Sequence, residues 1–123
     1  MDKVVRIAGR IENCYLVKGD YCYLVDTATR MTSKKIDQAF AEEKIKPEDL
    51  THIFITHYHA DHTWGNCFFP GATIVSHSLC RELMREKGTP SLEAAKKQNN
   101  ALRQVKIVLP HLTFSNGDLN LRV

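Results

Sequence analysis

Three histidines and one aspartate lie within six residues of the chain, at His57, His59, Asp61 and His62. An apolar run at residues 53–55 comes directly before them, which predicts a rigid strand leading into a loop. Alternate side chains of an extended segment point the same way, so the first three can share one side of the loop. A turn after Asp61 would bring His62 to a second, adjacent position. Imidazole and carboxylate together suit zinc, iron and related divalent ions, so the cluster favours a metal site over solvated loop residues.

The order of these residues resembles the HxHxDH signature of the metallo-β-lactamase superfamily, with Thr56 before it and Thr-Trp-Gly-Asn at residues 63–66 after it. By this resemblance, His57 and His59 would hold one metal ion. Asp61 and His62 would hold a second ion. Asp61 would also act as the catalytic residue, accepting a hydrogen bond from the attacking water. The implied cofactor is one or two Zn²⁺ ions, with iron or manganese as alternatives.

The resemblance covers the whole chain, because a hairpin ending in an aspartate, a helix, and a strand running into the ligand loop form the family's opening order. It implies an α+β fold, namely the N-terminal half of a four-layer αβ/βα sandwich, with a mixed or antiparallel sheet and helices on one face. In the family, a further histidine, a bridging carboxylate and a last histidine lie downstream. We therefore expect residues 1–123 to form one metallo-β-lactamase-like domain that is truncated before its second half.

The reaction implied by the resemblance is hydrolysis of an ester, thioester, amide or phosphoester in a small-molecule substrate, by a metal-activated water. Thioester hydrolysis of the glyoxalase II kind fits better than β-lactam hydrolysis. The 123-residue chain alone is expected to be a poor hydrolase, since its four ligands are divided between two ions. A superfamily nuclease, a flavodiiron-like iron site and a non-catalytic metal-binding half-domain that assembles with a partner are the alternatives.

Partners and compartment follow from simpler features. The net charge of +3 and the mixture of basic and acidic residues between positions 81 and 106 predict no nucleic-acid partner, and no apolar run approaches a membrane span. Residues 119–123 still alternate apolar and polar side chains, so a missing C-terminal half or a homodimer partner is expected to cover that strand. Charges at residues 2–6, where a signal peptide would be apolar, predict a cytoplasmic protein with reduced thiols.

The elements that must position the cluster follow from apolar periodicity, turn residues and helix caps. Residues 107–109 read as a buried strand, and Asn-Gly at 116–117 predicts a hairpin between residues 112–114 and 119–123. The other predicted strands span residues 4–7, 13–17, 21–25, 51–55 and 72–76, and the predicted helices span residues 33–44, 78–87 and 90–104, with Gly88 ending the second helix.

Several single residues stand near the cluster or share its chemistry. Asp26 could lie beneath the ligand loop and orient a histidine, or it could cap the next segment, and the residues leave both interpretations open. Trp64 is interpreted as a hydrophobic floor, and Gly65 as a site of positive φ or of close backbone approach. We interpret His52 and His77 as strand and strand-end residues rather than ligands.

Overall fold

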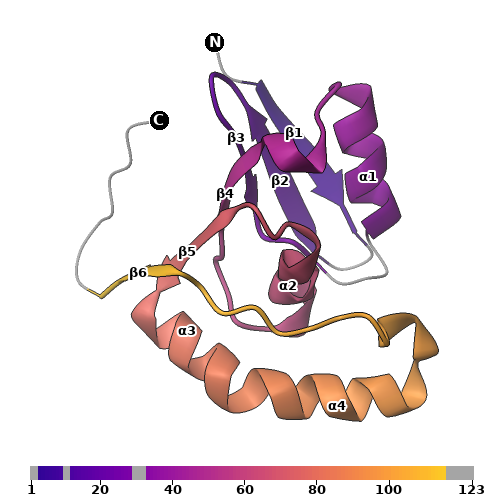
Figure 1. Ribbon diagram of the computed structural model, residues 1–123, viewed down its shortest axis with the longest axis vertical. Coiled ribbons are helices and arrows are strands. Elements are labelled where there is room, and N and C mark those ends of the chain that lie inside the picture. The colour runs from indigo at the N-terminus through magenta and orange to yellow at the C-terminus, as the bar shows by residue number, and fades with distance from the viewer. Residues whose placement is uncertain (1–2, 10–11, 29–32, 116–123) are drawn as a thin grey trace.

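The computed structural model describes residues 3–9, 12–28 and 33–115, apart from the side chains of Ser33 and Asp61. Within these residues, six strands form one mixed sheet in the order β1-β2-β3-β4-β5-β6 (Figure 1). The α+β class with a mixed sheet is therefore confirmed. The strands are β1 (Lys3–Ala8), β2 (Asn13–Lys18), β3 (Cys22–Val25), β4 (Leu50–Phe54), β5 (Thr73–His77) and β6 (Leu112–Phe114).

The helices lie in the connections between the parallel strands. β1, β2 and β3 pair antiparallel, whereas β3 to β6 pair parallel, and parallel neighbours need such long crossovers. The α-helices are α1 (Ser33–Glu42), α2 (Ala60–Thr63), α3 (Ser78–Leu83) and α4 (Thr89–Gln98). Shorter turns are η2 (Pro47–Asp49), η3 (Trp64–Phe68), the π-helical η4 (Met84–Gly88) and η5 (Asn100–Leu102).

One side of the sheet, called here the inner face, forms the main core. Strand register places one row of side chains on it, from Val5 through Leu16 and Leu24 to Ile53 and Ile74. All but Val5 are buried to 1% exposure or less. They pack in one cluster with the apolar stripe of α1, whose members are Ile36, Ala39 and Phe40.

The opposite side, the outer face, is also apolar but less covered. Its central row runs from Tyr15 through Val25 and Phe54 to Val75 and Leu112. Tyr15 is 37% exposed and Leu112 47%, whereas Val75 is buried. None of the five belongs to the core clusters of the described residues.

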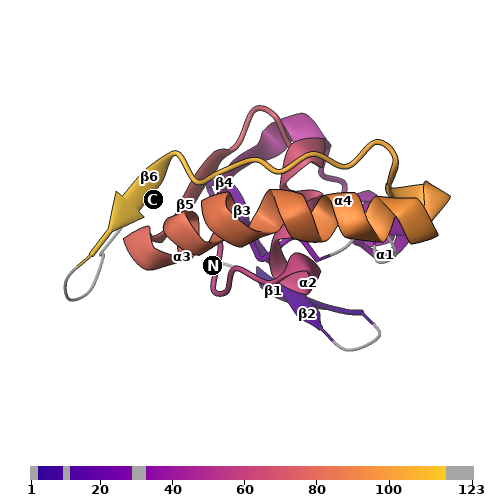
Figure 2. The ribbon, with the colours of Figure 1, turned by 90° about the horizontal axis from the view of Figure 1, so that it is seen from below.

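The predicted end of a helix at Gly88 is wrong. Figure 2 shows α3, η4 and α4 as one continuous helical rod, and Gly88 has right-handed helical angles of φ −63° and ψ −54°. The Ile107 side chain packs beside this position, because an ideal Cβ on Gly88 would lie 3.4 Å from Ile107 Cδ1, an ordinary van der Waals contact. Pro90 enters in the first turn of α4 as predicted, but that helix ends at Gln98 rather than near residue 104.

Residues 107–109 form no strand, so the buried strand predicted there is also wrong. The Val108 carbonyl accepts a hydrogen bond at 3.2 Å from Asn66 Nδ2, so its partner is a side chain and not a neighbouring strand. The strand at residues 112–114 is confirmed as β6. The hairpin turn at 116–117 and its second strand lie outside the described residues.

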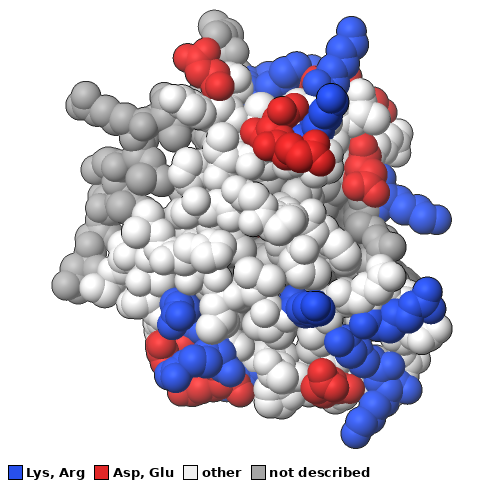
Figure 3. Space-filling model, viewed as in Figure 1, with Lys and Arg blue, Asp and Glu red and all other residues white. Residues whose placement is uncertain are grey.

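Charged side chains are mixed in sign on the face drawn in Figure 3. A band without Lys, Arg, Asp or Glu crosses the middle of this face, between groups in which both signs lie near each other. No helix in the described part of the chain is long and apolar enough to cross a membrane.

Candidate metal centre

Residues 56–66, called here the ligand loop, begin where two parallel strands end side by side. Val25 at the end of β3 pairs with Phe54 at the end of β4, so the residues that follow each strand meet at one edge of the sheet. The backbone continues this alignment, because Asp26 N donates to Phe54 O and Ile55 N to Val75 O, each at 2.9 Å. Residues after such strand ends are where α/β sheets present functional groups.

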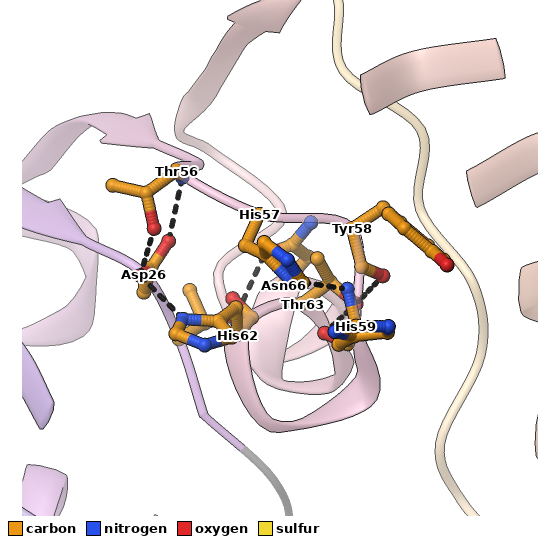
Figure 4. A network of polar contacts seen from close by, with 9 residues as sticks. Asp26, Thr56, His57, Tyr58, His59, His62, Thr63 and Asn66 are labelled. Atoms are coloured by element: carbon orange, nitrogen blue, oxygen red, sulfur yellow. Dashed lines mark hydrogen bonds and ion pairs between the residues drawn. The ribbon is translucent and has the colours of Figure 1, made fainter. Parts of the chain in front are cut away.

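Asp26 connects this edge to the ligand loop (Figure 4). Its Oδ1 accepts the Thr56 backbone N–H at 2.8 Å, and its Oδ2 accepts the Thr56 hydroxyl at 2.5 Å and His62 Nδ1–H at 2.7 Å. The carboxylate side chain is 5% exposed. Of the two interpretations left open by the sequence, the structure confirms that Asp26 lies beneath the loop and orients a histidine. Its φ of 63° is a sparsely populated conformation that the surrounding bonds hold in place.

Three imidazole rings lie together above this carboxylate. The His57 ring centroid is 4.1 Å from that of His59 and 5.3 Å from that of His62. His57 and His59 are exposed, and His57 Nδ1 accepts a long bond of 3.4 Å from the His59 backbone N–H. The carboxylate on His62 Nδ1 is the partner that a metal-ligating histidine usually has on its other nitrogen.

These residues suit a divalent ion in type and proximity, since zinc binds imidazole nitrogen at about 2.0–2.1 Å. Among the described side chains, however, no three His, Cys, Asp or Glu groups already converge as a metal-holding set. The exposed rings would therefore rotate on binding. The Asp61 backbone lies in α2, whereas its side chain is outside the described part, so its roles as ligand and catalytic residue stay predictions.

The loop is fixed from below by close backbone packing. An ideal Cβ on Gly65 would lie 2.1 Å from the Thr27 carbonyl oxygen, so the predicted close approach is confirmed. Gly65 N donates to Ala28 O, and Thr27 N to His62 O, each at 3.0 Å. The Thr27 hydroxyl also donates to Asn66 Oδ1 at 2.7 Å inside the protein.

Trp64 is buried in a second core cluster with residues of α4, η5 and the segment after it, as expected for a floor. Cys67 packs against that cluster, and its Sγ contacts the Trp64 carbonyl oxygen at 3.7 Å. Burial raises the pKa of the Cys80 thiol in α3, and the negative charge of Asp26 adds to the rise, while a hydrogen bond with Ser76 opposes it. The Cys80 thiol therefore stays protonated near neutral pH.

Two further histidines, His52 and His77, have structural roles. His52 stacks on Phe54 on the outer face. His77 Nδ1 accepts the Leu79 N–H at the start of α3, so this histidine caps the helix. The expectation that His52 and His77 are not ligands agrees with these contacts.

Four contacts around the loop were not predicted from the sequence. Tyr58 lies against the rings of His57 and His59, and Lys87 lies over the Tyr58 ring. Thr27 and Asn66 pair beneath the loop. Asn66 ends the Thr-Trp-Gly-Asn run that follows the motif, so its position could have drawn attention to it, whereas no local pattern points to Lys87.

Known proteins resemble this chain over these same elements. The family model for the metallo-beta-lactamase superfamily matches residues 7–121. Metallo-beta-lactamase domain-containing protein 1 of Xenopus laevis is 34% identical over 67 residues, which is 54% of this chain and 29% of the relative. A metallo-beta-lactamase from Cronobacter sakazakii superposes with a TM-score of 0.70 at 18% identity, over 96% of this chain and 47% of that one.

The subclass B3 metallo-beta-lactamase BJP-1 of Bradyrhizobium japonicum gives a TM-score of 0.61 at 26% identity, over 68% of this chain and 33% of that one. The chain thus spans less than half the length of each of these relatives. Its mixed sheet and helices match their fold over that share. With a family match across nearly all of its residues, the chain belongs to the metallo-beta-lactamase superfamily.

Proposed function

We propose that this chain is the ion-binding part of a metal-dependent hydrolase. His57 and His59 hold one divalent ion, zinc, and His62 with Asp61 contributes to a second. The observation that carries this proposal is the Asp26 carboxylate on His62 Nδ1 at 2.7 Å, with two more imidazoles beside that ring. A buried carboxylate that fixes a histidine ring is the outer partner typical of metal-ligating histidines.

A bound ion would supply Lewis acidity, which polarises a carbonyl or phosphoryl oxygen and lowers the pKa of a water. The chain's own residues do the positioning. Asp26 holds the His62 ring in one tautomer, and the Thr56 hydroxyl and N–H hold Asp26. Asp61 is proposed to accept a hydrogen bond from the attacking water. The substrate class that this chemistry fits is a small-molecule ester, thioester, amide or phosphoester.

Metal content tests the ion-binding proposal. Protein purified without chelator is compared, by elemental analysis after equilibration with zinc, with a His57→Ala/His59→Ala double variant. We expect the double variant to lose the bound zinc, and Asp26→Ala to weaken zinc binding about 10- to 100-fold, because the His62 ring loses its orienting partner.

His52→Ala is the matched control, since this histidine lies on the outer face, where it stacks on Phe54 and shares a hydrogen bond with Thr51. Its zinc content should equal that of the unaltered protein. Equal zinc in the unaltered protein and the double variant would contradict the proposal.

We also propose that a further polypeptide segment completes the site, either a C-terminal half or a second copy of the chain. Two features support this proposal: the chain spans 29% of its curated relative, and the outer face leaves apolar side chains such as Leu112 exposed. A catalytic zinc usually has three protein ligands and one open position. In the proposed site, each ion has only two ligands from this chain. The chain alone should therefore hydrolyse substrates poorly.

A non-catalytic half-domain that binds metal for assembly is the second candidate, and the same short ligand sets favour it. Measuring turnover of a thioester substrate by this chain distinguishes the incomplete hydrolase from the non-catalytic half-domain. Rates in the ordinary enzyme range of about 1–10³ per second, abolished by Asp61→Ala, would contradict the incomplete site. Zinc binding without turnover, also after addition of a completing segment, would favour the half-domain.

A further inference from the structure

Tyr58 stands between two of the proposed ligands in the sequence, and its ring contacts both of their rings. Its centroid is 5.4 Å from that of His57, with the planes nearly parallel at 16°, and 4.4 Å from that of His59, tilted at 44°. Figure 4 shows the Tyr58 side chain extending away from Asp26 and His62, on the far side of the two exposed histidines. The tyrosine thus borders the ring cluster on the side that Asp26 does not reach.

The Tyr58 ring also contacts a cation from a distant part of the chain, Lys87. Lys87 Nζ lies 5.8 Å from the Tyr58 ring centroid, within the range of a cation–π contact. Lys87 belongs to η4, the π-helical turn inside the α3–α4 rod. Because each residue of an α-helix advances by about 100° around the axis, one extra residue in a turn redirects the side chains beside it. The π-helical turn therefore helps to set the direction of Lys87.

We propose that Tyr58 is a positioning residue for His57 and His59, and that Lys87 holds Tyr58 in place. The inference rests on the proposed function, since the two histidines are positioned for the ion assigned to them there. Exposed side chains lose rotamer freedom when they bind an ion, and this loss weakens binding. A ring that stacks on His57 and packs at a tilt against His59 limits the rotation of both imidazoles beforehand, much as Asp26 limits His62.

The first measurement uses the metal-free protein and does not depend on ion binding. In NMR spectra, His57 and His59 ring protons should carry ring-current shifts that Tyr58→Ala removes and Tyr58→Phe retains. The His62 ring, held by Asp26, should keep its shifts in both variants. Lys87→Gln should move the Tyr58 ring signals, and Lys87→Arg should restore them, because arginine keeps a cation over the ring.

The second measurement is the zinc dissociation constant, obtained by competition with a chromogenic chelator. We expect Tyr58→Ala to weaken zinc binding about 10-fold, as loss of an outer partner does, at an unchanged melting temperature. Tyr58→Phe should stay within about 2-fold, and Lys87→Gln should weaken binding about 2- to 5-fold. Tyr21→Ala, at an exposed tyrosine in the β2–β3 turn, is the matched control and should leave binding unchanged.

The outcomes separate this inference from the proposed function. Unchanged zinc binding in Tyr58→Ala, or tighter binding, overturns the positioning role while leaving the metal site intact. If the unaltered protein binds no zinc, the proposed function fails, and the ring shifts of the metal-free protein then decide the inference. Identical His57 and His59 shifts in the unaltered protein and Tyr58→Ala would overturn it.

Discussion

On strand β4, Ile53 is fully buried within the core cluster that α1 completes, while the next residue, Phe54, is only partly buried on the outer face. Both residues are large and apolar, and both pair with apolar neighbours across the sheet. The two faces therefore differ less in composition than in what covers them. The outer row, which leaves Tyr15 and Leu112 exposed at its two ends, is a surface suited to a partner, whereas the inner row already provides stability.

Equal substitutions on the two faces should have unequal costs. Leu24→Ala on the inner face leaves a cavity at a fully buried site and should lower the free energy of unfolding by about 2–5 kcal/mol. Leu112→Ala on the outer face, at a side chain 47% exposed, should change it by about 0.5 kcal/mol or less. Denaturant unfolding of both variants measures the difference, and similar losses would show that the outer face is as stabilising as the inner.

The ligand loop should behave as part of the tightly packed region rather than as a free loop. Gly65→Ala places a methyl group against the Thr27 carbonyl and should lower the free energy of unfolding by about 1–3 kcal/mol. Gly71→Ala is the matched control, because a Cβ there meets nothing within 4 Å. A Gly65→Ala variant that melts like Gly71→Ala would mean that the loop can shift away from β3 at no cost.

A charge placed on the outer face tests whether that face associates. Tyr15→Lys should leave the free energy of unfolding within about 0.5 kcal/mol and should reduce both self-association in sedimentation and binding of a hydrophobic dye. Tyr21→Lys alters a tyrosine of similar exposure in a turn and should reduce neither. If the unaltered protein is a monomer at high concentration and binds no dye, the outer face needs no partner.

The smallest expected effect concerns the inner side of α3. Because burial raises the pKa of the Cys80 thiol, the unfolded chain releases this proton at a lower pH than the folded protein does. The resulting stability is fully present below the ordinary thiol pKa of about 8.5 and is lost as the pH rises toward the raised value. Unfolding midpoints between pH 7 and 10 should fall more steeply for the unaltered protein than for Cys80→Ala. Equal slopes would contradict the raised pKa.

Local sequence patterns predicted the features that local physics controls. Apolar, β-rich runs and turn residues located β1 to β5, and the ligand types of His57, His59 and His62 indicated the site, whose rings the structure brings together. The end of a helix at Gly88 was predicted wrongly, because the π-helical turn at Met84–Gly88 continues the helical backbone into α4.

Local patterns were also insufficient around the candidate metal centre. The Asp26 carboxylate could be assigned two roles from sequence, and only the meeting of β3 and β4 decided between them. Lys87 reaches Tyr58 through a π-helical turn, a feature with no dependable sequence signal. Contacts set by the relative placement of elements could not be predicted from periodicity.

The bond from Asn66 to the Val108 carbonyl spans 42 positions of sequence, and the bonds from Asp26 to Thr56 span 30. Such long separations make the contacts slow to form, since the intervening chain must close first. During synthesis at about 5–20 residues per second, the histidines would leave the ribosome roughly two to nine seconds before Val108 does. In that interval the nascent histidines would meet cellular metals without the architecture that orders them, and any ion captured then would bind the unfolded chain and oppose folding.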